Sequence, residues 1–404
     1  MPLALWVLTL SAFAIGTTEF VIVGLIPTIA TDLAVTLPSA GLLVSLYALG
    51  VAVGAPVLTA LSGRLPRKHL LIGLMLLFTA GNLLAWQAPG YTTLVFARVL
   101  TGLTHGVFFS IGSVIATRLV APQKAASAIA TMFTGLTVAL VTGVPLGTFI
   151  GQHFGWRATF LAVAALGALA VLGSALLLPR AIPHSAPAPL RQQLQVLARP
   201  RLLLVYAMTA VGYGGSFIAF TFLAPLLTQI SGFSVSAVSL VMLVYGVSVA
   251  VGNVYGGRLA DRLGPVGALK RVFLWLAAVL FVLFFAAPSP WLALATVLVW
   301  GAAAFGNVPA LQVYVVQQAQ REAPQASDVA SGLNIAAFNL GIAGGAWLGG
   351  EVVSRLGLIH TTWIGGLVVL GALALTAWSG RLDRRPRDHD APRERCGEVL
   401  VSNT

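Results

Sequence analysis

The sequence predicts an all-α membrane protein with twelve transmembrane helices in two pseudo-symmetric six-helix bundles. Three observations predict this fold class: 58% of the 404 residues are hydrophobic, 8% are charged, and the second half of the chain repeats a pattern of the first. An ordinary soluble domain carries about 25% charged residues. Apolar surface is therefore expected to face lipid rather than to be hidden in one core.

Helices, not barrel strands, are expected to cross the bilayer. The stretches from Leu70 to Leu84 and from Val272 to Ala287 are almost continuously apolar, whereas barrel strands alternate apolar and polar residues. The first stretch runs past Pro27 without a charged leader, so it is interpreted as a helix and not as a signal peptide. With about 20 residues per span, cutting at charged or Gly/Pro-rich breaks predicts helices near 4–29, 40–62, 70–87, 93–117, 125–151, 157–178, 202–229, 235–257, 270–287, 290–316, 327–350 and 358–379.

The basic residues predict the orientation of these helices. All but three of the 23 Lys and Arg residues fall on one side, in alternate loops, the linker and the tail; Arg157 and Arg355 lie on the other side, and Arg98 lies inside a helix. The positive-inside rule then places both termini in the cytoplasm. The predicted parts are an N-terminal bundle (1–178), a cytoplasmic linker (179–201), a C-terminal bundle (202–379) and a cytoplasmic polar tail (380–404).

The net charge of +12 is explained by this topology and by contact with anionic membrane lipid, so nucleic acid is not expected as a partner. The halves are related by a shift of 198 residues, which aligns Pro27 with Pro225, Tyr47 with Tyr245, and residues 51–54 with 249–252. Two parallel halves of this kind are typical of alternating-access carriers, whose substrate site lies between the halves near the midplane.

Several motifs resemble those of the major facilitator superfamily. The segment 257–264, G-R-L-A-D-R-L-G, resembles the signature of the loop between helices eight and nine, and its counterpart at 61–68 has Gly63 where the family has aspartate. The segment 98–106 resembles the buried-arginine motif implicated in proton coupling, and G-V-P-L-G at 143–147 is similar to the antiporter motif of drug/proton exporters. The segments 16–27 and 334–341 resemble the arabinose-efflux-permease group, which exports sugars, purines and drugs.

The resemblance implies gating roles for the residues of two of these motifs. Asp261, Arg262 and Arg64 correspond to the loop lock, and Gly143, Pro145 and Gly147 correspond to the antiporter motif. Gly143 and Pro145 are expected to bend helix five where it packs against the opposite half, limiting leak; a merely structural kink is the alternative.

Two charged residues, Glu19 and Arg98, are predicted deep inside spans, where charge is costly unless it faces a cavity or a partner. A carboxyl group there can gain and lose a proton as its exposure alternates, and a guanidinium can stabilise the carboxylate or bind substrate. The alternative is a structural ion pair or a snorkelling side chain. His105 shares one helical face with Arg98 and Gly102 and is expected to line the cavity or simply to pack. Asp32, a further proton-coupling candidate, is expected at the external end of helix one, where a solvated charge is the alternative.

The second half supplies the candidate substrate residues. An aromatic cavity with a few hydrogen-bonding amides is common at small-molecule sites, although packing or lipid contact is the alternative for each aromatic residue. The candidates are Tyr213, Phe217, Phe220, Asn307, Gln312, Asn334, Phe338 and Asn339.

These features predict a proton-coupled exporter of sugars, purine nucleosides or lipophilic drugs in a bacterial inner membrane, working as a monomer by alternating access. A proton symporter or facilitator for a small polar solute is the nearest alternative, and a non-transporting receptor is a more distant one. The chain has no H-E-x-x-H and no Walker pattern, so neither enzymatic chemistry, a metal site nor ATP drive is expected. The proton gradient is the expected energy source, with no cofactor.

Overall fold

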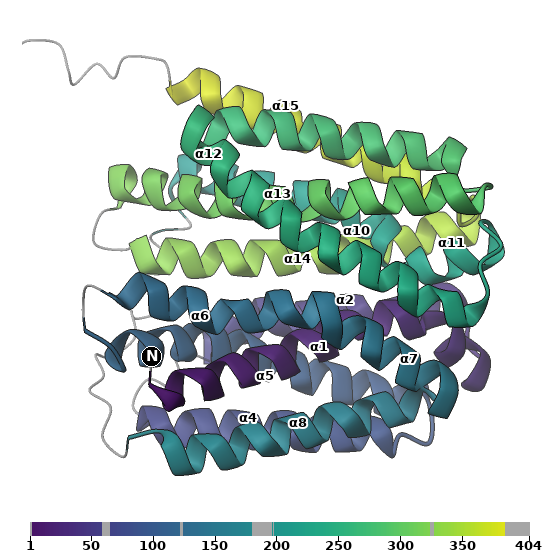
Figure 1. The fold of residues 1–404 in the computed structure, drawn as a ribbon. Helices are drawn as coiled ribbons and strands as arrows, with labels where there is room; N and C mark the ends of the chain where they lie inside the picture. Colours follow the sequence, from purple (N-terminus) through teal and green to yellow (C-terminus); the bar gives the residue numbers. More distant parts are fainter. Residues whose placement is uncertain are drawn as a thin grey trace, which may run out of the picture.

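The computed structural model describes residues 2–58, 65–121, 124–179, 196, 198–323 and 327–383, and every element in these ranges is helical. Figure 1 shows the helices of the first half packed together, with those of the second half stacked beside them. The first half contains α1 (Leu3–Asp32), α2 (Leu37–Val53), the π-helix η1 (Gly54–Leu58), α4 (Arg67–Trp86), α5 (Tyr91–Arg118), α6 (Ala125–Val138), the π-helix η3 (Ala139–Gly143), α7 (Val144–Phe154) and α8 (Trp156–Leu177).

The second half begins inside the predicted linker and ends inside the predicted tail. It contains α10 (Pro200–Phe220), α11 (Leu223–Gln229), α12 (Val235–Ala286), α13 (Pro290–Glu322), α14 (Ser327–Arg355) and α15 (His360–Asp383). Pro200 opens α10 and Pro290 opens α13, positions where the missing N–H of proline costs no helical hydrogen bond.

The predicted loop between helices eight and nine is wrong in extent. The chain is helical on both sides of Gly264, which has a φ of 70° and is followed by Pro265, and α12 bends sharply at this point (Figure 1). A left-handed backbone favours glycine, and proline cannot continue the hydrogen-bond ladder, so the two residues explain the bend. Asp261 and Arg262 therefore lie on a helix and not in a loop.

Eleven helices in the described residues are long and apolar enough to cross a membrane, where the sequence predicted twelve. The difference comes from α12, whose 52 residues form one element with two arms. At about 1.5 Å per residue, a straight helix of that length would be more than twice as long as the hydrocarbon core of a bilayer, which is about 30 Å thick.

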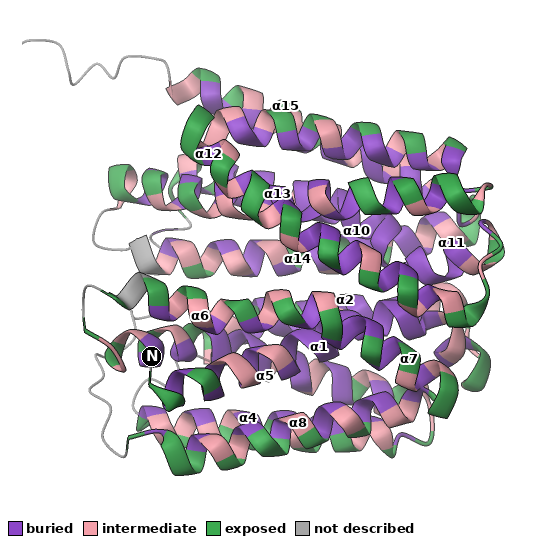
Figure 2. Cartoon of the chain, viewed as in Figure 1, coloured by how far each residue is buried: buried purple, intermediate pink, exposed green. Residues whose placement is uncertain are grey.

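Burial separates central helices from peripheral ones. In the most apolar windows, 83% of α1 and 78% of the segment Pro200–Gln229 are buried, against 33% of α8. Figure 2 shows this contrast, with exposed residues on the outer faces of α4, α8 and α15. α1 and α10 are therefore surrounded by protein, whereas the outer helices present apolar side chains such as Leu176 and Phe285 to the surroundings.

The two halves touch closely at the end of the molecule where α1 ends. The ring of Phe222, in the short break between α10 and α11, occupies the space left by a missing side chain: a Cβ on Gly41 of α2 would lie 2.6 Å from its Cζ atom. Ser45 of α2 also donates a 2.9 Å hydrogen bond to the carbonyl oxygen of Ala343 in α14. This end holds the halves together through α2, α11 and α14.

Candidate functional site

A crossing of α2 and α5 brings the candidate proton residues together. A Cβ on Gly102 of α5 would lie 2.3 Å from the carbonyl oxygen of Tyr47 in α2, so this close approach requires glycine. Arg98 lies one turn before Gly102 and His105 lies one turn after it on the same face. Both side chains contact the side chain of Tyr47, Arg98 at its ring and His105 at its hydroxyl group.

Four side chains form what we call the charge cluster: Glu19, Tyr47, Arg98 and His105. The Tyr47 hydroxyl and His105 Nδ1 are 3.0 Å apart, the Arg98 guanidinium lies 4.1 Å from the centre of the Tyr47 ring, and His105 Nδ1 lies 3.9 Å from Glu19 Oε2. Each is almost fully buried, with 7% of Glu19 and 1% of Arg98 exposed. Buried ionisable groups are costly, so such a cluster is a functional-site hypothesis.

Arg98 binds backbone and not the Glu19 carboxylate. Its Nη1 donates to the carbonyl oxygen of Thr18 at 2.6 Å, Nη2 to that of Glu19 at 3.4 Å, and Nε to that of Leu43 at 3.3 Å. Among described residues the ion pairs within 4.0 Å include Glu19 with His105 but not Glu19 with Arg98. The carboxylate therefore lies within the field of the guanidinium without being locked to it, which leaves an oxygen free to take a proton.

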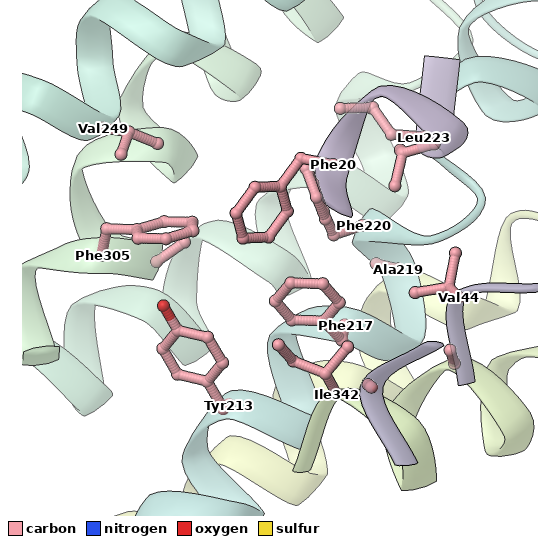
Figure 3. Close-up of a cluster of buried hydrophobic side chains, with 14 of the residues drawn as sticks. Phe20, Val44, Tyr213, Phe217, Ala219, Phe220, Leu223, Val249, Phe305 and Ile342 are labelled. Carbon is pink, nitrogen blue, oxygen red and sulfur yellow. The ribbon is translucent and has the colours of Figure 1, made fainter. Parts of the chain in front are cut away.

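The four aromatic residues among the predicted substrate residues belong to one aromatic cluster, made of Phe20, Tyr213, Phe217, Phe220, Phe305 and Phe338. Tyr213 lies at its centre, with ring centroids 4.6 Å from Phe338, 5.6 Å from Phe217 and 5.7 Å from Phe305. Figure 3 shows the rings of Phe20, Phe217, Phe305 and Tyr213 turned toward one another. The rings pack closely in this conformation. Close packing is compatible both with a role in binding substrate and with a role in helix packing alone.

The four predicted amides divide into two pairs. Asn334 accepts a 2.7 Å hydrogen bond from Thr209 and donates to Gln312 at 3.1 Å, so this pair is satisfied inside the protein. Asn307 and Asn339 each donate only to a carbonyl of their own helix, and their side-chain oxygens meet no donor among the described residues. A buried oxygen without a donor costs about 1–3 kcal/mol, so these two are the better candidates to accept a hydrogen bond from a substrate or from water.

Asp32 lies away from the charge cluster, at the exposed end of α1. It accepts hydrogen bonds from Arg157 at 2.6 Å and from Trp156 Nε1 at 2.9 Å, and Arg157 also donates to the carbonyl oxygen of Ala88. These contacts tie the ends of α1 and α4 to the start of α8. The structure therefore places Asp32 in an end-of-helix ion pair and not beside Glu19.

The gating candidates are spread over different sites. Asp261 and Arg262 are exposed on α12, without a hydrogen bond or ion pair to another described residue, and Arg64 lies outside the described residues. Gly147 faces Val21 of α1, where a Cβ would lie 2.6 Å from Val21 Cγ2. Pro145 is buried and is the second residue of α7, which begins directly after the π-helix η3.

The π-helix η3, which ends at Gly143, contacts both α1 and α12, so helix five packs against the opposite half here as expected. A Cβ on Gly143 would lie 2.1 Å from Thr17 Oγ1, so this glycine packs against α1 of its own half and not against the opposite half. The contact across the halves comes one turn earlier, where a Cβ on Gly246 of α12 would lie 2.2 Å from the carbonyl oxygen of Leu140. The π-helix η3 thus lies between α1 and α12, with glycine on each side.

Sequence reasoning missed two features. The sequence marks Tyr47, the residue that joins Arg98 to His105, only by its identity with Tyr245 in the repeat. The second feature is Asp383, the last residue of α15, which forms an ion pair with Arg201. It accepts hydrogen bonds from Tyr314 at 2.7 Å and from Gln318 at 3.0 Å, and Arg321 lies 3.9 Å away. Because Asp383 follows the predicted end of the last helix, the sequence predicts it to lie in the polar tail.

No group of three or more His, Cys, Asp or Glu side chains in the described part of the chain has the spacing to hold a metal ion. The profile of the Major Facilitator Superfamily matches residues 8–331. The chain belongs to this superfamily. Its members are transporters, so the chain is a multi-pass membrane transporter.

Three relatives of this superfamily chain align over nearly its whole length. An uncharacterized MFS-type transporter, YtbD of Bacillus subtilis, is 52% identical, covering 95% of this chain and 97% of the relative. The inner membrane transport protein YdhP of Escherichia coli is 42% identical, with coverages of 93% and 95%. A probable sugar efflux transporter of Mannheimia succiniciproducens is 33% identical, with coverages of 91% and 91%.

The fold is also similar to that of a solved transporter. A bacterial homologue of the human lysosomal transporter Spinster, in an inward-facing and unoccupied conformation, superposes with a TM-score of 0.77, covering 95% of this chain and 98% of the other. The identity of 19% means that this likeness supports the shared fold alone.

Proposed function

We propose that this transporter exports small molecules in exchange for protons, by alternating access between its two halves. The charge cluster carries the proposal. Glu19 is a buried carboxyl group 3.9 Å from His105, and Arg98 holds the backbone beside it without pairing with its oxygens. A carboxyl group in this position can bind a proton when it faces one side of the membrane and release it on the other.

The proposed cargo is a sugar, a purine nucleoside or a lipophilic drug. The aromatic cluster offers ring faces, and Asn307 and Asn339 offer side-chain oxygens that have no donor among the described residues. Sites of this composition bind small molecules with an apolar body and a few polar groups. One relative is named a probable sugar efflux transporter, which supports export as the direction.

We further propose twelve membrane crossings in a bacterial inner membrane, with both termini in the cytoplasm, a monomeric carrier, and the proton gradient as the sole energy source. The two arms of α12 count as two crossings in this topology. Cys396, the one cysteine of the chain, lies in the proposed cytoplasmic tail, outside the described residues. Labelling of Cys396 by a membrane-impermeant maleimide in intact cells would contradict this orientation, whereas labelling only after permeabilisation agrees with it.

Transport in everted membrane vesicles tests the function. We expect an acidified vesicle lumen to drive accumulation of at least one of three radiolabelled probes, L-arabinose, inosine or chloramphenicol, and a protonophore to abolish it. Antiport moves the proton and the cargo in opposite directions, so a symporter would instead accumulate the probe when the lumen is alkaline. Equal flux with and without the gradient would identify a facilitator, and a lack of flux for all three probes would favour a receptor.

A further inference from the structure

We propose that Phe20 transmits the protonation state of Glu19 to the C-terminal half, as the positioning residue that couples the charge cluster to the aromatic cluster. The inference rests on the proposed function, because it requires Glu19 to bind a proton. It assigns a role to a residue whose side chain carries no charge and no hydrogen-bonding group. Three observations about its place in the structure support the assignment.

First, Glu19 and Phe20 are neighbours on α1 whose side chains contact opposite halves. The Glu19 carboxylate faces His105 of α5, in the N-terminal half. The Phe20 ring, 4% exposed, lies 6.4 Å from the ring of Phe217 on α10 and 6.2 Å from that of Phe305 on α13, both in the C-terminal half. Figure 3 shows this ring inserted between Phe217 and Phe305.

Second, the backbone that carries Phe20 is held by the charge cluster itself. Arg98 donates hydrogen bonds to the carbonyl oxygens of Thr18 and Glu19, the two residues directly before Phe20. When the carboxyl group of Glu19 changes charge, the attraction between it and the Arg98 guanidinium changes as well. Any resulting shift of Arg98 acts on these carbonyl groups and therefore on the position of the Phe20 ring.

Third, the aromatic cluster leads from Phe20 to the candidate substrate residues. Phe217 stacks on Tyr213 with an interplanar angle of 21°, and Tyr213 meets Phe338 edge to face at 4.6 Å. Packed interiors do not deform continuously, so a displaced ring must be accommodated by a change in its neighbours. Displacement of Phe20 is thus transmitted to rings on α10, α13 and α14.

The groups that face Glu19 come from three other helices. Arg98 and His105 approach from α5 and Tyr47 from α2, and the Tyr213 hydroxyl on α10 is close enough to interact electrostatically with the carboxylate. Each of these groups is retained when Phe20 alone is changed. A Phe20 variant therefore leaves the proton site in place and tests the link to the other half.

The test measures the pH response of the distance between halves in the full-length protein without substrate. Spin labels replace Leu42 of α2 and Trp347 of α14, two residues that line the small pocket between the halves, in a Cys396→Ser background. Pulsed electron resonance then gives the ratio of long-distance to short-distance populations in acidic and in alkaline buffer. Because an aromatic contact contributes modestly, we expect Phe20→Leu to reduce the acid-to-alkaline change in this ratio by roughly 2- to 10-fold.

The matched control is Phe78→Leu, which truncates a fully buried ring of α4 on the far side of the N-terminal half and is expected to keep the wild-type pH response. Phe20→Met, which keeps more of the side-chain volume, replaces Phe20→Leu if the latter folds poorly. Adding Phe305→Leu to Phe20→Leu is expected to cause less further loss than Phe305→Leu causes alone, because both changes break the contact between Phe20 and Phe305.

The outcomes separate the inference from the function on which it rests. A wild-type pH response that Glu19→Gln abolishes and Phe20→Leu diminishes supports both. If Glu19→Gln abolishes the response but Phe20→Leu and Phe20→Met leave it intact, the role of Phe20 is overturned and the proton site stands. If the wild type does not respond to pH, or Glu19→Gln responds as the wild type does, the proposed proton site and the inference are overturned together.

Discussion

The two halves contain the same helix crossing with different side chains beside it. Gly102 of α5 faces the carbonyl oxygen of Tyr47, and Gly301 of α13 faces that of Tyr245, where a Cβ would lie at 2.3 Å and 2.7 Å respectively. Tyr47 and Tyr245 are equivalent in the repeat of 198 residues. In both halves a glycine lets the helices meet backbone to backbone, so the crossing is common to the duplicated unit.

The side chains around the two crossings differ in charge. Four residues before the glycine stand Arg98 in one half and Val297 in the other; three residues after it stand His105 and Ala304. In the repeat, Phe217 is at the position equivalent to Glu19. Glu19, Arg98 and His105 thus each have an apolar counterpart in the second half, whereas the counterpart of Tyr47 is Tyr245.

A duplicated fold can divide its tasks between its two halves. Burial of charge is costly, so a symmetric pair of charged sites would pay that cost twice. Here the N-terminal crossing holds the ionisable groups, and the C-terminal crossing holds rings that pack against Phe20 and one another. Substitutions at the two crossings can test whether the charges belong to the first crossing alone.

The largest effect is expected for Glu19→Gln, which should abolish pH-driven accumulation in everted vesicles. The amide keeps the shape of the side chain but cannot bind and release a proton. The protein should still fold and exchange substrate down its gradient. Accumulation of inosine, L-arabinose or chloramphenicol at the wild-type level would show that the proton travels through another group, such as His105.

The second largest effect is expected for Phe217→Glu, which puts a carboxyl group at the position equivalent to Glu19. The aromatic surroundings offer no cation to it, so we expect a loss of about 3–5 kcal/mol in the free energy of unfolding. Denaturant titration in detergent measures this loss. Phe217→Leu is the control, with an expected loss below about 1.5 kcal/mol; a stable Phe217→Glu would mean that the two crossings tolerate charge equally.

The helices were largely predictable from the sequence, because continuous apolar stretches and the spacing of charges mark membrane spans directly. The exception, α12, continues through Asp261 and Arg262 because two charges do not end a helix; the break comes at Gly264, where the backbone is left-handed. Spacing on one helix also predicted that Arg98 and His105 share a face. It could not reveal that Tyr47 joins them or that Arg98 binds the carbonyl oxygens of α1, since both contacts depend on how separate helices cross.

A smaller effect is expected for Gly102→Ala and for Gly301→Ala, which add a methyl group at each crossing. The new Cβ meets backbone that cannot rotate away, so we expect each to destabilise the protein by about 1–3 kcal/mol, with the larger loss at Gly102. Gly73→Ala is the control, because a Cβ there would meet no atom within 4 Å beyond the adjoining backbone of its own helix. Unfolding in denaturant compares the three variants, and a larger loss at Gly301 would reverse the order that the two distances predict.

The smallest effect separates the two tyrosines. Tyr47→Phe removes the hydroxyl group that lies 3.0 Å from His105 Nδ1 but keeps the ring under the Arg98 guanidinium, so we expect a loss of about 0.5–1.5 kcal/mol in stability. Tyr245→Phe removes a hydroxyl group that has no partner among the described residues, so its stability should not fall. The same pair should differ in transport, because His105 without its tyrosine partner can rotate away from Glu19, which slows pH-driven export in Tyr47→Phe alone. Equal losses in the two variants would mean that the hydroxyl group of Tyr47 contributes only to packing, and that the charged crossing depends on the Tyr47 ring and on Arg98.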